Sequence, residues 1–337
     1  MRAWQIQTTD GIDALAIASP APTTLGPNDV RVRVRASSLN YRDLMTVINP
    51  AGRTQLPLTP NSDSAGEIIE VGSAVDSLSV GDHVATLFFQ RWQDGWITED
   101  GMRSALGGTL NGVLAEEVIL PASGVISLPA HMDCRQGSTL PCAALTAWHS
   151  VVERGQTKAG DHVLILGTGG VSIFALQFAK LLGARAIVTS SSDAKLERAR
   201  ALGAHETINY RENPDWDERV LEITDGRGVD HVVEVGGPGT LVKSINACRV
   251  GGMIGLIGIL TGAGGMVNPT AMMRKSINLH GIYVGSRRMF ENMNRALALH
   301  RLEPIIDQDF AFDDARSAYH AMEKAGHFGK IVVRVND

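Results

Sequence analysis

The sequence predicts an α/β protein with two domains, a β-rich one and one built on a parallel sheet covered by helices. The chain has 337 residues, whereas a single domain usually has about 100–200. Up to about residue 125, short strand-like segments are separated by turn signals. Beyond about residue 130, short apolar segments alternate with amphipathic ones, as the strands and helices of a parallel sheet do.

In the β-rich part, the clearest strand covers residues 30–36, where apolar and polar side chains alternate with a period of two. Further strands are expected over residues 65–71, 83–88 and 112–120. Residues 90–111 are polar and rich in glycine, so we expect a long surface loop there. Its Trp92 and Trp96 either line a substrate cleft or pack the loop down.

In the second part, strands and helices are expected to alternate. The strands are expected over residues 163–166, 186–190, 207–210, 230–235, 253–259 and 279–284. The helices are expected over residues 171–182, 193–202, 216–224 and 240–248. The tail, residues 290–337, adds one or two helices and a final strand over 330–335.

The composition excludes several classes of protein. Lys and Arg total 31 against 36 Asp and Glu, a net charge of −5, so nothing in the overall charge attracts nucleic acid or an anionic membrane. Cys134, Cys142 and Cys248 are few and far apart, which argues against disulfides and against a paired CxxC zinc site. Residues 1–16 lack a secretory signal, and the longest apolar run, 251–260, is about half a membrane span. We expect a cytoplasmic protein.

The strongest local signal is the segment 161–172, DHVLILGTGGVS. An apolar strand runs directly into the turn Gly167-Thr168-Gly169-Gly170, and a helix follows. Such glycines make a tight turn and let backbone amides approach a pyrophosphate at the positive end of the helix. Ser172 stands where the fingerprint usually has its third glycine. We expect a dinucleotide to be bound by Gly167, Gly169, Gly170 and Val171; the alternative is a purely structural turn.

The end of the next strand indicates which dinucleotide binds. NAD sites usually carry an acidic residue about 20 residues beyond the glycine turn, on the ribose 2′-hydroxyl. Here the strand ends in four hydroxyl residues, and the first carboxylate, Asp193, is expected to cap the following helix. Hydroxyls of Ser191 and Ser192, with Lys195 and Tyr210, favour the 2′-phosphate of NADP(H). Alternatively, the serines only begin a helix and Lys195 is solvated.

Beyond this turn, the order and spacing of several segments resemble the medium-chain dehydrogenase/reductase superfamily over essentially the whole chain. The segments are Asn40-Tyr41-Arg42-Asp43, 65–67 with 71–72, 81–84, 141–148, 208–210, 226–230 and 328–332. The resemblance implies a GroES-like β-rich catalytic domain over residues 1–125 and 295–337. It also implies a Rossmann domain, a doubly wound parallel sheet, over residues 126–294. It further implies a homodimer formed through strands near residues 279–285, with a tetramer as the alternative.

Within that superfamily the sequence resembles the branch without catalytic zinc. Zinc alcohol dehydrogenases have a cysteine where this chain has Asn40, and a Gly-His-Glu segment where it has Asn61-Ser62-Asp63. Cys142 matches the third ligand, but one thiol and two neutral oxygens make a poor zinc site. The four-cysteine structural zinc lobe is also missing. The sequence most resembles quinone oxidoreductases of the zeta-crystallin type, so we expect no zinc.

The resemblance assigns expected roles to individual catalytic residues. Without a metal, hydrogen-bond donors must stabilise the oxyanion that forms as hydride reaches the substrate. We expect the Asn40 amide to do so, with the adjacent Tyr41 as a second donor. Arg42 replaces the hydroxyl of the alcohol dehydrogenase proton relay. Asp43 is either a further catalytic residue or a structural partner of Arg42 and the backbone.

Further cofactor contacts are expected from the resemblance and from the ends of strands, where open parallel sheets bind ligands. Thr146 is expected beside the nicotinamide; alternatively it only lies on a helix face. Lys330 is expected at the pyrophosphate; alternatively it is solvated. The remaining expected contacts, at the ends of two successive strands, are Gly258, Ile259, Val284 and Gly285.

These features together predict an NADPH-dependent reductase that transfers hydride, without zinc, to a quinone or an activated alkene such as an enal or enone. One alternative is an NAD(P)-dependent alcohol dehydrogenase or carbonyl reductase. The other is a non-catalytic NADPH-binding protein, a role that zeta-crystallin shows for this fold.

Overall fold

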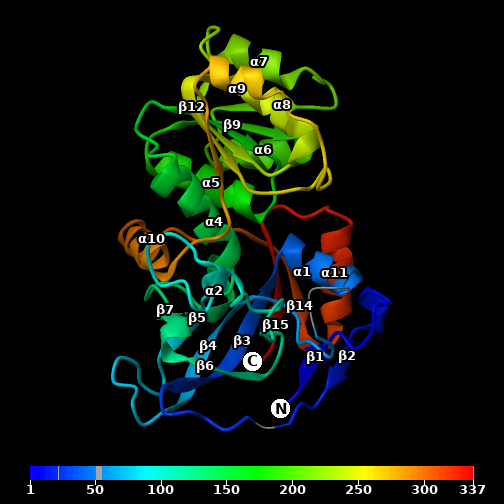
Figure 1. The fold of residues 1–337 in the computed structure, drawn as a ribbon, viewed down its shortest axis with the longest axis vertical. Coiled ribbons are helices and arrows are strands. Elements are labelled where there is room, and N and C mark those ends of the chain that lie inside the picture. Colours follow the sequence, from blue (N-terminus) through cyan, green and yellow to red (C-terminus); the bar gives the residue numbers. More distant parts are fainter. Residues whose placement is uncertain (22, 51–54, 337) are drawn as a thin grey trace. The chain divides into compact units, whose positions relative to one another are not determined.

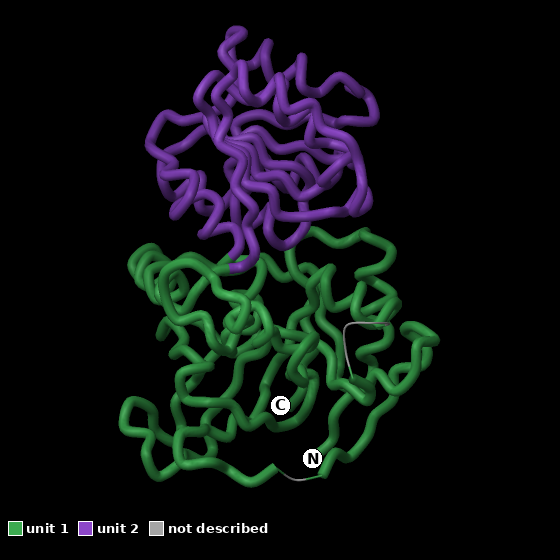
Figure 2. Tube along the Cα trace, viewed as in Figure 1, with its two compact units in different colours: residues 1–145, 285–337 green, residues 146–284 purple. Residues whose placement is uncertain are grey.

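The computed structural model describes residues 1–21, 23–50 and 55–336. The chain forms two compact units, with residues 1–145 and 285–337 in unit 1 and residues 146–284 in unit 2 (Figure 2). This division differs from the boundaries expected at residues 125 and 295. The reason is that the flanking segments bond within unit 1: Arg287 donates to the carbonyl of Val125, and Asn294 donates to that of Ser127.

Among the described residues of unit 1, seven strands form one sheet and two short strands form another (Figure 1). The order in the larger sheet is β14-β15-β3-β4-β5-β7, with β6 also paired to β3. Among the strands described in this sheet, β14 and β15 form the one parallel pair. The strands are β1 (Ala3–Gln5), β2 (Ala16–Ala18), β3 (Asp29–Leu39), β4 (Asp63–Val71), β5 (His83–Thr86), β6 (Glu117–Pro121), β7 (Val125–Ser127), β14 (Ile306–Ala311) and β15 (Lys330–Arg334).

The last strand completes this sheet from the far end of the chain. β15 runs antiparallel to β3, with Ile331 opposite Leu39. Because Lys330 begins β15, the pairing puts it next to the end of β3 and the start of helix α1 (Tyr41–Ile48). The sheet therefore brings Lys330 to the Asn40 segment.

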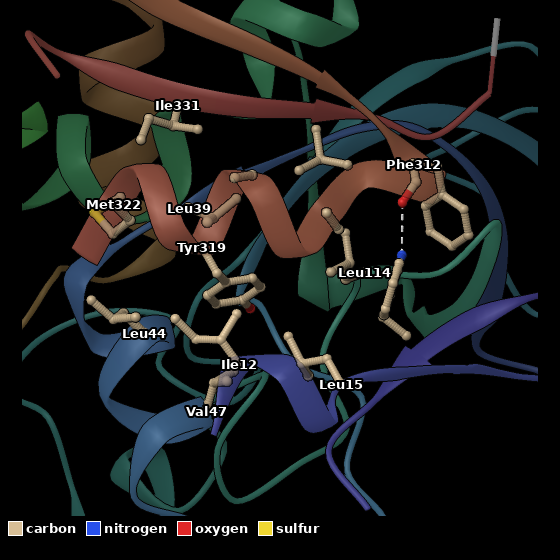
Figure 3. Close-up of a cluster of buried hydrophobic side chains, with 14 of the residues drawn as sticks. Ile12, Leu15, Leu39, Leu44, Val47, Leu114, Phe312, Tyr319, Met322 and Ile331 are labelled. Atoms are coloured by element: carbon tan, nitrogen blue, oxygen red, sulfur yellow. Dashed lines mark hydrogen bonds between the residues drawn. The ribbon is translucent and has the colours of Figure 1, made fainter. Parts of the chain in front are cut away.

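The main core of unit 1 packs α1 and α11 (Ala315–Glu323) against the neighbouring strands (Figure 3). Tyr319 of α11 is completely buried in this core, together with Leu39 of β3 and Leu44 of α1. The dashed line in Figure 3 marks the bond from Trp4 Nε1 to the carbonyl of Phe312, 2.7 Å long. The other helices of the unit are η1 (Ile12–Ala14), α2 (Glu99–Met102), η2 (Ala122–Gly124), α3 (Cys134–Gly137), η3 (Leu140–Ala144), α10 (Arg287–His300) and η5 (Phe312–Asp314).

Every residue of unit 2 is described, and six parallel strands form its sheet in the order β10-β9-β8-β11-β12-β13. The direction of chain order reverses between β8 and β11, as in doubly wound dinucleotide-binding folds. The strands are β8 (His162–Leu166), β9 (Arg185–Ser190), β10 (Glu206–Asn209), β11 (Val229–Glu234), β12 (Cys248–Leu256) and β13 (Asn278–Gly281). The helices are η4 (His149–Arg154), α5 (Gly170–Leu181), α6 (Asp193–Leu202), α7 (Trp216–Ile223), α8 (Pro238–Ala247) and α9 (Pro269–Arg274), with α4 (Leu145–Trp148) at the boundary.

The predicted fold class, a β-rich part with a parallel α/β part, is confirmed, but some elements differ. The strand expected over 253–259 begins at Cys248 and ends at Leu256, and β6 covers only the second half of the expected strand 112–120. The edge strand β14 was not predicted, because polar residues interrupt its apolar pattern. No helix in the described part of the chain has the length and apolar character needed to cross a bilayer.

The prediction of a plain surface loop over residues 90–111 is wrong in part, since the segment contains α2 and buries Trp92. The Trp92 ring meets that of Phe89 edge to face at 6.0 Å between centroids. Trp92 thus packs the loop down. Trp96, by contrast, is 74% exposed. The alternative that Trp96 lines a substrate cleft stays untested.

Candidate active site

The glycine turn follows β8 and leads into α5, as the sequence predicts. Gly167 has φ of +74°, a conformation that favours glycine. Gly169 precedes the first turn of α5, and a side chain at Gly169 would meet no other atom within 4 Å. The first backbone amides of a helix lack acceptors within it and attract anions. The open turn and these amides therefore fit a pyrophosphate.

Ser172 is not a defect in this turn. It is buried, and its hydroxyl donates to the carbonyl of Leu166 at 2.7 Å, so it joins the helix to the end of β8. The third fingerprint position needs close packing between helix and strand. A serine supplies that packing here through a hydrogen bond.

The residues expected at the adenosine phosphate lie at the ends of two neighbouring strands. Asn209 at the end of β10 is opposite Ser190 at the end of β9, so Ser191 and Tyr210 follow side by side. Lys195 is half-buried in the first turn of α6, and Tyr210 is exposed. The structure therefore brings Ser191, Ser192, Lys195 and Tyr210 to one edge of the sheet; their contact with a phosphate stays a prediction.

The expectation that Asp193 caps α6 is wrong. Ser192 is the N-cap residue, and Asp193 is the first residue of the helix. Its carboxylate accepts a hydrogen bond of 2.8 Å from the Asn209 amide. This bond ties the carboxylate to β10.

A buried carboxylate that the sequence analysis missed shapes the next turn. Glu234 ends β11 and is completely buried. Its Oε1 accepts from the amides of Gly236 and Gly237 at 2.7 and 3.0 Å and from the Thr240 hydroxyl at 2.7 Å, while its Oε2 accepts from Ser244. Glu234 thus holds the turn between β11 and α8 from inside.

The loop after β12 is tied to the same turn. The Thr261 hydroxyl donates to the carbonyl of Gly236 and accepts from the amide of Gly239, both at 2.8 Å. At Gly258, a Cβ would lie 2.2 Å from the carbonyl oxygen of Val235, so only glycine fits. Ile259 beside it is 51% exposed. Packing therefore explains Gly258, and the cofactor contacts of both residues stay predictions.

Val284, at the end of unit 2, has a strained backbone. Its φ of +56° is rare for any residue with a side chain and exceptional for a β-branched one. Its carbonyl accepts from His149 Nδ1 at 2.8 Å. Thr146 is buried in the same unit, whereas Gly285 belongs to unit 1. Strain of this kind is typical of functional sites.

In unit 1, the segment Asn40–Asp43 forms a buried polar cluster with Lys330. Asn40 is the N-cap of α1 and only 8% exposed. Its backbone amide donates to Asp43 Oδ2 at 2.9 Å, and its side-chain Oδ1 accepts from Lys330 Nζ at 2.6 Å. Its Nδ2 is buried and has no hydrogen-bond partner. The cluster therefore leaves one donor of Asn40 unused.

Tyr41 and Asp43, on the first turn of α1, differ in exposure and in hydrogen bonding. Tyr41, the first residue of α1, is 40% exposed. Asp43 is completely buried, and besides the Asn40 amide it accepts from Arg42 Nη1 at 3.1 Å. Arg42 Nη1 also donates to the carbonyls of Leu106 and Gly107. These contacts favour the structural alternative for Asp43, and a catalytic role for it stays untested.

Lys330 is not solvated, so that alternative is wrong. It is 2% exposed, and its Nζ also donates to the carbonyl of Leu39 at 2.7 Å. Burial lowers the pKa of Lys330, and the nearby Asp63 carboxylate opposes this effect. The expected contact of Lys330 with pyrophosphate stays a prediction.

Asp63 is the acidic partner of this cluster, and the sequence analysis did not select it. It is completely buried at the start of β4 and accepts from the Ser62 hydroxyl at 2.6 Å and the Cys142 amide at 3.0 Å. Burial raises the pKa of Asp63 to about 6, although Lys330 lowers it. The side chain of Asn40 also lowers this pKa from hydrogen-bonding range, although its Nδ2 meets the full geometry of a hydrogen bond with no partner.

Comparison with known proteins identifies the family. Residues 26–130 match the alcohol dehydrogenase GroES-like domain, and residues 170–299 match the zinc-binding dehydrogenase model. A zinc-type alcohol dehydrogenase-like protein of Schizosaccharomyces pombe is 42% identical over 323 residues, which cover 94% of this chain and 93% of that protein. The chain belongs to the medium-chain dehydrogenase/reductase superfamily. It is therefore an NAD(P)H-dependent oxidoreductase, and the expected GroES-like and Rossmann parts are confirmed.

Solved structures and a further relative give the range within this superfamily. A Sinorhizobium meliloti protein of alcohol dehydrogenase type is 40% identical with a TM-score of 0.93, covering 99% of this chain and 98% of that one. An NAD-dependent alcohol dehydrogenase is 31% identical with a TM-score of 0.91, each chain being fully covered. The human quinone oxidoreductase is 25% identical over an alignment of 346 positions that covers 99% of this chain and 97% of that protein. Both alcohol dehydrogenases and quinone oxidoreductases are thus relatives.

The residues of this dehydrogenase/reductase at the zinc positions do not suit zinc. Asn40 and Ser62 offer neutral oxygens, and burial raises the pKa of the Cys142 thiol well above its ordinary value. Asp63 is already bonded to Ser62 and the Cys142 amide. Within the described ranges, no three His, Cys, Asp or Glu side chains are grouped so as to hold a metal ion. This donor set does not fit the metal named in the family model.

Proposed function

We propose that this protein uses NADPH to reduce a quinone or an activated alkene such as an enal or enone, without zinc. The observation that carries the proposal is the buried and unpartnered Nδ2 of Asn40. A buried donor without an acceptor costs about 1–3 kcal/mol, so it calls for a partner such as a ligand or an ordered water. A substrate oxygen would supply the missing acceptor.

The chemistry of conjugate reduction matches such a donor. Bound NADPH supplies a hydride, and its addition to a conjugated carbon places negative charge on the carbonyl oxygen of the substrate. Asn40 Nδ2 donates to that oxygen and stabilises the charge, and the exposed Tyr41 hydroxyl is placed one residue away as a second donor. Arg42 has no hydroxyl that could relay a proton. Its guanidinium also donates to Asp43 and to two backbone carbonyls, so it is not placed to relay one either. This favours conjugate reduction over alcohol oxidation.

The choice of NADPH over NADH rests on the edge formed by β9 and β10. Ser191, Ser192 and Lys195 offer two hydroxyls and an ammonium there, which suit a phosphate. The nearest carboxylate, that of Asp193, is bonded to Asn209. This bond argues against Asp193 as the ribose-binding acid of an NAD site.

The first test is a fluorescence titration of chelator-treated protein with NADPH and with NADH, followed by a quinone and an enone. We expect NADPH to bind more tightly and its signal to decay when the acceptor is added. Tighter binding of NADH would refute the choice of nucleotide. Turnover that appears only when zinc and an alcohol are supplied would establish the alcohol dehydrogenase alternative, which the names of the close relatives favour.

The donor itself is tested by Asn40→Ala. Loss of an oxyanion donor should lower kcat by about 10²–10³-fold while the Kd for NADPH changes less than about twofold. Asn336→Ala, which removes another part-buried amide of unit 1, is the matched control and should keep full activity. An unchanged kcat in Asn40→Ala would exclude the proposed role.

We also propose a homodimer that forms through β13. This strand is an edge of the unit 2 sheet, paired only with β12 among the strands described. An edge strand exposes unpaired backbone groups that a second copy can pair with. Light scattering should give twice the chain mass of 36.0 kDa, and His280→Pro should shift the mass towards the monomer. A monomeric wild-type protein would exclude this arrangement.

A further inference from the structure

We propose that Lys330 is a positioning residue whose ammonium group sets the orientation of the Asn40 amide, so that Nδ2 and not Oδ1 faces the substrate. The inference rests on the proposed function, because it gives Lys330 a role only through the Asn40 donor. It also differs from the pyrophosphate contact expected from the sequence.

The orientation follows from the chemistry of the two groups. An ammonium has three donors and no acceptor, whereas an amide has one acceptor end and one donor end. Lys330 Nζ lies 2.6 Å from Asn40 Oδ1, within bonding distance. If the amide were turned over, its NH₂ group would face the ammonium with two donors together. Lys330 therefore allows only the orientation that leaves Nδ2 free.

The ammonium is itself held in place. Nζ donates to the carbonyl of Leu39 at 2.7 Å, and the side chain is 98% buried by the pairing of β15 with β3. Burial lowers the pKa of Lys330, and the Asp63 and Asp43 carboxylates oppose this effect. A charged group so enclosed has no freedom to leave the Asn40 amide.

The backbone of Asn40 is restrained as well, which leaves its side chain as the part that Lys330 controls. The backbone amide donates to Asp43 Oδ2, and the backbone carbonyl accepts from the amides of Asp43 and Leu44. With both ends restrained, Nδ2 is a preorganised donor that needs no rearrangement as charge develops on the substrate.

The double-mutant cycle of Lys330→Met with Asn40→Ala tests the inference. Lys330→Met keeps the length of the side chain and removes the donor and the charge. We expect kcat to fall about tenfold with an NADPH Kd within about twofold of wild type. In the Asn40→Ala background, the same substitution should lower kcat less than about twofold, because the group through which it acts is gone.

A second variant keeps the test valid if Lys330→Met does not fold. Lys330→Gln has both a donor and an acceptor and allows either orientation of the Asn40 amide, so kcat should lie between those of wild type and Asn40→Ala. Lys330→Arg keeps a group with donors only and should restore part of the activity. Melting temperatures accompany each assay.

The outcomes separate this inference from the proposed function. If Asn40→Ala keeps full kcat, the proposed function itself fails. If Asn40→Ala is impaired but Lys330→Met is not, or if the two losses multiply independently, Lys330 does not act through Asn40. If Lys330→Met weakens NADPH binding and leaves kcat unchanged, the pyrophosphate contact is the correct role and the positioning role is refuted.

Discussion

Three buried polar residues of unit 1 differ in how their atoms are satisfied. Both oxygens of Asp43 accept hydrogen bonds, and the ammonium of Lys330 donates to two oxygens. Only Asn40 among the three keeps a polar atom without a partner. Buried polar groups are satisfied in most proteins, and an exception calls for an explanation such as a ligand or an ordered water. Because only Asn40 has an unused donor, we propose that Asn40 contacts the substrate and that Asp43 and Lys330 hold it in place.

The buried imidazole of His231 predicts a loss of stability in acid. Burial lowers its pKa in the folded protein from 6.5 to about 3, and its Nε2 is 3.0 Å from the Ser150 hydroxyl. Between these values the unfolded chain binds the proton and the folded chain does not. The free energy of unfolding therefore falls as the pH drops from about 6.5 towards 3, by up to about 1.4 kcal/mol per pH unit.

The control for this prediction is His231→Gln, which keeps a donor near Ser150 and cannot be protonated. Urea titrations at several pH values should give the variant a shallower fall than wild type below pH 6. Asp63 acts in the opposite direction, because its raised folded pKa of about 6 makes stability fall as the pH rises from about 4 to 6. It is present in both proteins, so the difference isolates His231. Parallel curves would contradict the assignment.

We expect the side chain of Lys195 to make the protein prefer NADPH to NADH. Lys195→Ala should raise the Kd for NADPH about tenfold, about 1.4 kcal/mol, because an ammonium–phosphate bond is lost. The Kd for NADH should not change. Lys180→Ala, on the last turn of α5 in the same unit, is the matched control. Equal weakening of both nucleotides would show that Lys195 acts on something other than the 2′-phosphate.

At the scale of elements, the site depends on how strands end and helices begin. Ser172 joins the start of α5 to the end of β8, and Ser192 begins α6 directly after β9. Glu234 holds the start of α8 to the end of β11. These bonds all lie at the carboxyl ends of parallel strands, where open α/β sheets bind ligands. The sheet thus positions its loops through buried side chains.

The hydrogen bonds that Glu234 accepts predict that removing its carboxylate lowers the stability of the protein substantially. Glu234→Ala leaves the amides of Gly236 and Gly237 and the Ser244 hydroxyl without their acceptor, and should destabilise the protein by about 3 kcal/mol. Glu234→Gln keeps one acceptor oxygen and should cost less. Urea denaturation measures both. Wild-type stability in Glu234→Ala would show that water replaces the carboxylate at this turn.

At the scale of the whole molecule, unit 1 is made from both ends of the chain. Residues 285–337 follow unit 2 in the chain but belong to unit 1. They contribute β15 to a sheet that otherwise consists mainly of strands from residues 1–145, and α11 packs beside that sheet. Ile331, Val332 and Val333 of β15 are completely buried. Unit 2 is continuous and has its own core. Unit 1 therefore needs the segments on both sides of unit 2, whereas unit 2 has the contacts of an independent domain.

Deletion of residues 330–337 tests this arrangement. The loss of three buried side chains, each worth about 1.5–3 kcal/mol, should prevent unit 1 from folding stably. Limited proteolysis should then degrade unit 1 and leave a resistant fragment close to residues 146–284. Deletion of the N-terminal Met1 and Arg2, which are exposed, is the control and should leave both units resistant. Equal resistance of unit 1 in both truncated proteins would contradict the prediction.

The sequence alone determined the class of fold, the family and the glycine turn. These depend on local patterns: apolar strands before glycines, amphipathic helices and motifs in a constant order. It also selected Asn40, through the residue that replaces a metal ligand. It did not identify Asp63 or Glu234 as buried carboxylates, because local sequence does not show which acidic residues lose contact with water.

Only the tertiary structure showed where Lys330 lies and which atoms it contacts. The sequence allows a solvated cation or a phosphate contact, and the pairing of β15 with β3 buries the ammonium against Asn40, 290 residues away in the chain. Likewise, only the structure shows that the carboxylate of Asp193 accepts a hydrogen bond from Asn209 on the neighbouring strand. Sequence patterns report periodicity and local turns, whereas the state of a buried polar group depends on partners that only the folded sheet brings within hydrogen-bonding distance.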